Sequence, residues 1–246
     1  MSDVCLVVPC FNEAARLNVA DFLAHLDASP RSSFCFVNDG STDQTAAALK
    51  DLASRDRERI LVLSLARNAG KAEAVRQGVL HVAQLPRFEV AGYWDADLAT
   101  PLSELARMLE TLDQSPGCQL VLGSRWRHLG SNIERRAWRH AVGRVFSTAA
   151  SLVLDMTVYD SQCGAKIFRT ALAAVLFEEP FITRWLFDVE LLARLRQHHP
   201  HASMHTVAIE SPLRQWRDVS GSQLRLLQMA TVPAGLLAIH RRYRQR

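Results

Sequence analysis

The chain has 246 residues, 48% apolar and 22% charged, which is enough to bury the core of one large α/β domain. Its net charge of +4 is mild, but the basic residues are unevenly placed, which suggests an anionic surface or substrate; we expect no nucleic-acid partner. No apolar run reaches the roughly 18 residues of a membrane span. The five cysteines are scattered and no basic segment precedes the apolar N-terminus. We therefore expect a cytoplasmic protein, either free or peripheral on the cytoplasmic face of a membrane.

The first half of the chain alternates short apolar runs with amphipathic patterns. Buried strands are predicted over residues 4–9, 34–37, 60–65, 90–94 and 119–123, because such runs are typical of a parallel sheet. Helices are predicted over residues 13–27, 43–54, 71–85 and 102–114. This order predicts an α/β fold with a doubly wound sheet, whose functional edge lies at the carboxyl ends of the strands.

The second half begins after residue 124 with a basic stretch. A helical pattern over 135–154 is followed by the apolar "AKIF", helical segments over 170–178 and 184–197, a strand over 204–210 and a terminal helix from about residue 222. No repeat, low-complexity tract or linker interrupts the chain. We therefore predict a single domain over 1–246, with halves at 1–124 and 125–246.

Polar residues follow each of the first four predicted strands, in the segments "PCFNE", "NDGSTD", "ARNAGK" and "DADLATP". Because the carboxyl ends of parallel strands share one edge, these segments are expected to meet. The residues gathered there would be Asn12, Glu13, Asp39, Asp43, Asn68, Lys71, Asp95 and Asp97.

Two of these carboxylates, Asp95 and Asp97, lie at i and i+2 in extended backbone, so both side chains can point the same way. Oxygen ligands that leave positions open for phosphates suit Mg²⁺ or Mn²⁺. The alternative is that Asp97 caps the next helix while Asp95 is merely exposed.

The other edge segments carry weaker signals. Asp39 is suited to accept hydrogen bonds from a base or ribose, and the alternative is that Asp39 and Asp43 cap the following helix. "NAGK" places Gly70 and Lys71 at a helix start, where they either favour phosphate or are simply solvated.

The ordered motifs "VVPCFNEAARL", "VNDGSTDQT", "ARNAGKAEAVRQG", "DADLATP", "GSR" and "DSQCGAKIF" resemble those of family 2 glycosyltransferases with the GT-A fold. They look most like the branch of dolichyl-phosphate glucosyltransferases and polyprenyl-phosphate mannose or glucose synthases. The resemblance covers about residues 4–225 and implies an inverting, metal-dependent hexose transfer from a nucleotide diphosphate sugar. Residues 1–124 would bind this donor and residues 125–246 the acceptor. One departure is Asn38, where the family more commonly has the first Asp of "DDGS".

The resemblance also implies individual roles. Asp95 and Asp97 would lie at the metal, and Asp97, Arg125 and Asp160 would be the catalytic residues. The positions implied to bind the nucleotide sugar are Pro9, Phe11, Asn12, Glu13, Asp39, Gly70, Lys71, Asp95, Gln162, Trp185, Asp188 and Glu190.

Charge development in the reaction explains the catalytic set. Negative charge grows on the departing diphosphate, and a cation at Asp97 with Arg125 nearby would stabilise it. Asp160 would be the base for a hydroxyl acceptor, whereas a lipid phosphate is already ionised and needs positioning instead. The alternative for Asp160 is a loop-stabilising turn.

The acceptor is predicted to be a polyprenyl or dolichyl phosphate at a membrane surface, with a soluble or glycan hydroxyl acceptor as the alternative. Residues 135–154 and 224–239 both read as amphipathic helices that either lie on an anionic membrane or pack on the sheet. Arg135, Arg136, Arg139 and Arg144 lie in the first of them.

Two further function classes are less well supported. A sugar-nucleotide pyrophosphorylase would usually carry a Gly-rich, Arg-containing loop after the first strand, where this chain has "PCFNE". A catalytically inactive binding module would be expected to lose the Asp-x-Asp pair, which is present. UDP-glucose is the favoured donor, with GDP-mannose as the alternative.

Overall fold

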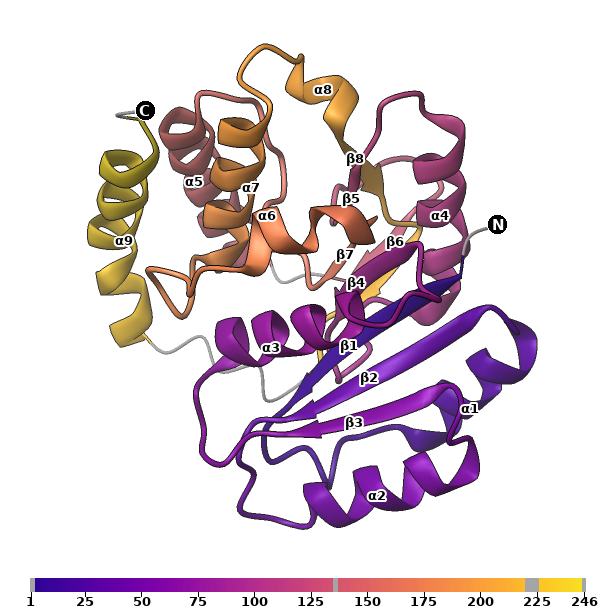
Figure 1. The fold of residues 1–246 in the computed structure, drawn as a ribbon. Coiled ribbons are helices and arrows are strands. Elements are labelled where there is room, and N and C mark those ends of the chain that lie inside the picture. Colours follow the sequence, from indigo (N-terminus) through magenta and orange to yellow (C-terminus); the bar gives the residue numbers. More distant parts are fainter. Residues whose placement is uncertain (1–2, 135–136, 220–225, 245–246) are drawn as a thin grey trace.

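A seven-stranded sheet organises the protein, for which a computed structural model describes residues 3–134, 137–219 and 226–244 (Figure 1). Its strand order is β3-β2-β1-β4-β7-β5-β8, and every neighbouring pair is parallel except that β7 runs antiparallel to both β4 and β5. The strands are β1 (Val4–Cys10), β2 (Ser32–Asn38), β3 (Ile60–Ser64), β4 (Val90–Trp94), β5 (Leu120–Ser124), β7 (Ala165–Arg169) and β8 (Ala208–Pro212). The predicted α/β class with a mostly parallel sheet is confirmed.

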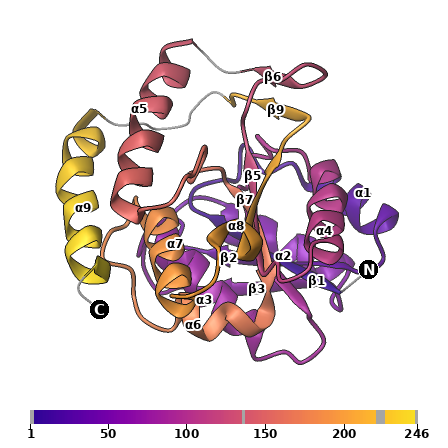
Figure 2. The same ribbon diagram turned by 90° about the horizontal axis from the view of Figure 1, so that it is seen from above.

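Helices cover both faces of this sheet. One apolar layer joins it to α1 (Val19–Ala28), α2 (Thr45–Arg55) and α4 (Leu105–Gln114). The other joins it to α3 (Lys71–Ala83), α6 (Ala173–Phe177) and α7 (Phe187–His198), with α5 (Ala137–Leu154) and α9 (Leu226–Arg244) side by side beyond α7 (Figures 1 and 2). No helix in the described ranges is long and apolar enough to span a bilayer.

The strand order places a crevice at one edge of the sheet. The chain moves outward from β1 to β2 and β3, and α3 then crosses the opposite face to β4, on the other side of β1. Ligands of open α/β sheets bind where the strand order reverses in this way, outside the carboxyl ends of the strands. The reversal lies between β1 and β4, so the segments after these two strands flank the expected binding crevice.

Several predicted boundaries are wrong. The first helix begins at Val19, because Glu13–Leu17 form a turn closed by Leu17 N–H donating to the Glu13 carbonyl at 2.8 Å. The helix predicted from residue 184 begins at Phe187. Residues predicted as a strand from 204 start with the short helix α8 (Met204–Val207), and β8 follows.

A second sheet was not predicted. It pairs β6 (Asn132–Glu134) with β9 (Gln215–Arg217) in parallel, near the start of α5 in Figure 2. Three-residue strands are too short for a periodicity to reveal them.

Candidate active site

The loops after β1, β2, β3 and β4 meet at the carboxyl edge of the sheet. Asn12 N–H donates to Ser41 Oγ at 3.1 Å, and Asn12 Oδ1 accepts the Thr42 N–H at 2.9 Å, which ties the first loop to the second. Asp43 Oδ1 accepts the Thr45 N–H at 2.9 Å just before α2, whose N-cap residue is Gln44. The convergence expected from the sequence is therefore present.

Asp39 ties the second loop to the third. Its carboxylate is buried and accepts the backbone N–H groups of Ala69 at 2.7 Å and Gly70 at 2.9 Å. Burial raises the pKa of this carboxyl, and the two N–H donors oppose the rise. Gly40, at φ +62°, allows the close approach, since a Cβ there would lie 2.4 Å from the carbonyl carbon of Arg67. Asp39 thus sets the backbone ahead of α3, and nucleoside binding by it stays a prediction.

Asp95 and Asp97 follow β4 directly and are both half-buried. Asp95 forms an ion pair with Lys71 Nζ at 2.5 Å, and Asp97 Oδ1 accepts the Ala99 N–H at 3.0 Å. Leu98 adopts φ +49°, a conformation that is costly for a non-glycine residue and recurs at functional sites. The helix-capping alternative for Asp97 is wrong, because the next helical turn starts only at Leu102.

Gly164, which precedes β7, provides the space for Asp95. The Gly164 carbonyl accepts the Asp95 N–H at 3.0 Å, and a Cβ on this glycine would lie 1.8 Å from Asp95 Oδ2. Any side chain at position 164 would therefore displace the Asp95 carboxylate.

Negative charge exceeds positive charge around the Asp-x-Asp pair. Burial raises the pKa of Asp97, and the neighbouring charge of Asp95 raises it further. Burial likewise raises the pKa of Glu13, against the effect of its ion pair with Arg16 at 2.6 Å, while both aspartates add to the rise. Glu13 Oε2 is buried and has no hydrogen-bond partner. Such an excess of hard oxygen donors fits a divalent cation.

The protein by itself offers only part of a coordination sphere. No group of three or more His, Cys, Asp or Glu side chains is arranged to hold a metal ion within the described ranges. A cation bound at Asp95 and Asp97 would therefore need further ligands from a substrate phosphate and water.

Arg125 follows β5 and forms a bidentate ion pair with Asp160, at 2.6 Å from Nε to Oδ2 and 2.7 Å from Nη2 to Oδ1. Its guanidinium carbon also lies 5.5 Å from the ring centroid of Trp216. Glu210 accepts the N–H groups of Tyr159 and Asp160 at 2.8 and 2.7 Å, which fixes this loop. Both Asp160 oxygens bind the guanidinium, and Oδ2 also accepts the Arg125 N–H at 3.0 Å, so this carboxylate is largely engaged within the protein. The geometry favours the loop-stabilising alternative.

Asp188 joins the second half of the chain to the edge. Its Oδ1 accepts hydrogen bonds from Tyr93 Oη and from Lys166 Nζ, the latter at 2.6 Å, and Lys166 is fully buried. Desolvation acts to lower the pKa of Lys71, but the charges of Asp95 and Asp188 outweigh it and raise that pKa. Sequence reasoning missed Tyr93 and Lys166. The available signal was a lysine inside the apolar strand "AKIF", which requires a buried carboxylate.

Glu190 does not reach the edge, so its predicted place in a sugar pocket is wrong. The side chain is fully buried and accepts hydrogen bonds from Arg194 Nη2 at 2.8 Å, Tyr243 Oη at 2.9 Å and Ile182 N–H at 2.8 Å. Among the other predicted residues, Phe11 and Trp185 are exposed, whereas Pro9 and Gln162 are half-buried.

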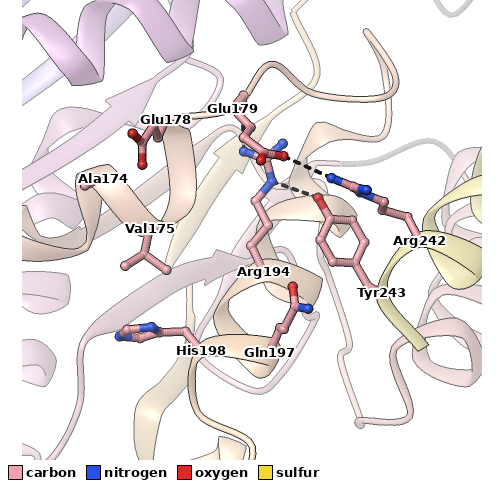
Figure 3. A pocket seen from close by; sticks show the side chains of 9 residues that line it. All are labelled: Ala174, Val175, Glu178, Glu179, Arg194, Gln197, His198, Arg242 and Tyr243. Carbon is pink, nitrogen blue, oxygen red and sulfur yellow. Dashed lines mark hydrogen bonds and ion pairs between the residues drawn. The ribbon is translucent and has the colours of Figure 1, made fainter. Parts of the chain in front are cut away.

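A cavity of about 340 Å³ lies away from this edge, between α6, α7 and α9 (Figure 3). In Figure 3, Arg194 contacts Tyr243, and Arg242 contacts Glu179. All five guanidinium N–H groups of Arg194 are donated to acceptors of the protein. This cation therefore has a structural role, and the carboxyl edge stays the candidate active site.

Solved structures share this fold. Glucosyl-3-phosphoglycerate synthase from Mycobacterium tuberculosis, in complex with Mn²⁺, UDP and phosphoglyceric acid, matches with a TM-score of 0.68 at 18% identity, covering 97% of this chain and 78% of that one. Its complex with Mn²⁺ and UDP-glucose matches with a TM-score of 0.65 at 18% identity, over 97% and 79% of the two chains. The likeness confirms the GT-A-type architecture.

Curated relatives are similar over most of their length. A dolichyl-phosphate beta-glucosyltransferase of Mus musculus is 31% identical over 233 residues, covering 89% of this chain and 68% of the relative. One from Trichomonas vaginalis is 29% identical over 245 residues, covering 95% and 69%. The family model described as "Glycosyl transferase family 2" matches residues 5–177. These matches show that the chain belongs to glycosyl transferase family 2.

Proposed function

We propose that this glycosyltransferase moves a glucosyl group from UDP-glucose to the phosphate of a polyprenyl or dolichyl lipid, with inversion at the transferred carbon. The observation that carries the proposal is the Asp95–Asp97 pair beside Lys71 at the reversal of strand order. The names of the similar dolichyl-phosphate beta-glucosyltransferases support the acceptor. Family membership favours transfer over the pyrophosphorylase and inactive-module alternatives.

The first four loops are proposed to bind the donor. Asp39 and the backbone that it holds at Gly70 would contact the nucleoside, as would the β1 loop from Pro9 to Glu13. Lys71 and Asp95 would lie at the ribose and diphosphate, and Asp97 would hold Mg²⁺ or Mn²⁺. When bound, such an ion neutralises the charge that grows on the departing diphosphate.

The second half is proposed to bind the sugar and the acceptor. Asp160 holds Arg125 in a fixed orientation, so that the guanidinium can stabilise phosphate charge. Gln162 and Trp185 would contact the sugar. Asp188 would orient the end of β4 through Tyr93. A lipid phosphate attacks as an anion and needs no base, which agrees with an Asp160 carboxylate already paired with Arg125.

A membrane-facing surface is proposed on α5 and α9. On α5, Val145 and Leu152 are 73% and 76% exposed, whereas Phe146, Ala149 and Val153 pack against the core. Apolar side chains exposed beside an adjacent helix are typical of an interfacial site. Arg135, Arg136 and Arg139, which belong to the helix predicted over 135–154, lie outside the described side chains.

Vesicle flotation tests this surface. Val145→Glu combined with Leu152→Glu should lower the fraction bound to anionic vesicles, and unchanged flotation would contradict the assignment.

The test of function compares donors and acceptors directly. Calorimetry with and without Mn²⁺ should detect UDP-glucose binding, with GDP-mannose as the competing donor. Radiolabelled transfer should yield a lipid-linked product from dolichyl phosphate in vesicles. Transfer to a soluble hydroxyl acceptor alone would favour the alternative acceptor class. Failure of every nucleotide sugar to bind would overturn the proposal.

A further inference from the structure

Arg184 is an exposed cation at the donor edge that comes from the second half of the chain. It lies between α6 and α7 and packs on Gly70, the residue that precedes α3. A Cβ on Gly70 would meet the Nε and Cδ atoms of Arg184 at 3.3 and 3.5 Å. The Arg184 side chain therefore packs along Gly70, the residue whose N–H is held by Asp39 and which precedes Lys71.

This guanidinium differs from Lys71 and Arg16, two other cations near the edge. Lys71 pairs with Asp95 and Arg16 pairs with Glu13. Arg184, by contrast, has no ion pair or hydrogen bond with any residue in the described part of the chain. Its charge reaches Asp39, where it opposes the rise in pKa that burial causes. The hydrogen-bonding capacity of Arg184 is thus left for a ligand.

The backbone that carries Arg184 is held on both sides. Leu186 N–H donates to Thr183 Oγ1 at 2.9 Å, and Ile182 N–H donates to the buried Glu190 at 2.8 Å. Glu190 is itself held by Arg194 of the same helix, α7, and by Tyr243 of α9. Because the backbone is already anchored, binding a ligand through Arg184 requires little further ordering of this segment.

We propose that Arg184 binds a phosphate group of the nucleotide donor. The inference rests on the proposed function and adds a residue to its donor site. A guanidinium matches phosphate oxygens in a bidentate geometry that a lysine ammonium cannot reproduce. The carboxylates Glu13, Asp39, Asp95 and Asp97 would repel a diphosphate, so a cation without a carboxylate partner beside Gly70 is well placed to offset them.

The experiment compares UDP with uridine, both titrated calorimetrically in the presence of Mn²⁺. Arg184→Gln should weaken UDP binding about tenfold to a hundredfold and leave uridine binding unchanged, because only UDP carries phosphate. Arg184→Lys should restore part of the loss. The matched control is Arg57→Gln, an exposed arginine before β3 at the amino edge of the sheet, which should bind both ligands as the wild type does.

The outcomes separate this proposal from the one before it. If Arg184→Gln leaves the ratio of UDP affinity to uridine affinity unchanged, the role of Arg184 is overturned. The proposed donor site still stands in that case, provided that the wild type binds UDP. A higher KM for dolichyl phosphate with unchanged UDP affinity would assign the arginine to the acceptor phosphate and equally overturn the donor assignment. A wild type without affinity for UDP or GDP would overturn both proposals.

Discussion

Two sets of carboxylates in this protein differ in how their charge is balanced. Asp160, Asp188 and Glu190, in the second half, each bind a buried or largely buried cation and are largely buried themselves. At the donor edge, Glu13 and Asp97 carry raised pKa values, because burial and neighbouring carboxylates are not offset by their cations. The difference teaches that the first set is balanced by cations within the fold, whereas the second set keeps an excess of negative charge, which we propose a bound ligand balances.

The largest effect is expected from breaking a completed pair. Lys166→Met leaves Asp188 buried without its cation, which should lower the free energy of unfolding by about 3–5 kcal/mol. Urea denaturation measures this loss. Lys50→Met, at an exposed position on α2, should change stability little. Equal losses of unfolding free energy in the two variants would show that the buried Lys166–Asp188 pair contributes no more to stability than an exposed lysine.

The opposite result is expected at the donor edge. Asp97→Asn should lower transfer activity by about a hundredfold or more. Losing one group that stabilises charge in a transition state typically has an effect of this size. Thermal stability without metal should stay the same or rise, since a repulsive charge is removed. Asp27→Asn, an exposed surface change, is the control. An Asp97→Asn variant that is active but less stable than the wild type would show that Asp97 has a structural role, like Asp160, Asp188 and Glu190.

The contact between Gly164 and Asp95 can be tested by a double-mutant cycle. Gly164→Ala should destabilise the wild type by about 1–3 kcal/mol, as overpacking does, and lower activity, because the new methyl group displaces the Asp95 carboxylate. In an Asp95→Ala background the same change should cost much less, since the Asp95 carboxylate atoms that the new methyl group would meet are gone. If the stability losses of the two substitutions in thermal unfolding are additive, the direct contact between Gly164 and Asp95 is contradicted.

A smaller effect concerns pH. An acid whose pKa is higher in the folded than in the unfolded chain binds protons more readily when folded, so its contribution to stability falls as pH rises. For Asp97 this fall is expected over the pH range from the ordinary pKa of 3.8 up to the raised pKa of the folded protein. The stability of the wild type relative to Asp97→Asn should therefore fall as pH rises through that range and level off above it. A flat difference in metal-free urea titrations would contradict the raised pKa.

Much of the donor edge could be predicted from local patterns. Apolar runs that end in "NDGS" or "DADL" identify both the strand and the polar loop after it, because strand length and turn chemistry are local properties. Asp39, Asp95 and Asp97 were placed correctly at the edge for this reason. Glu190 was misplaced, because its spacing from Asp188 does not reveal which side of α7 faces the sheet.

The sequence by itself determined the alternation of strands and helices and the edge where the polar loops meet, since both follow from short-range periodicity and the geometry of parallel strands. The tertiary structure alone decided which charges are balanced. It inserted β7 antiparallel between β4 and β5, which set Gly164 against Asp95 and brought Lys166 to Asp188, 22 residues away in the chain. Asp188 also meets Tyr93, which is 95 residues distant. Such pairings depend on how whole elements pack, and no local pattern records them.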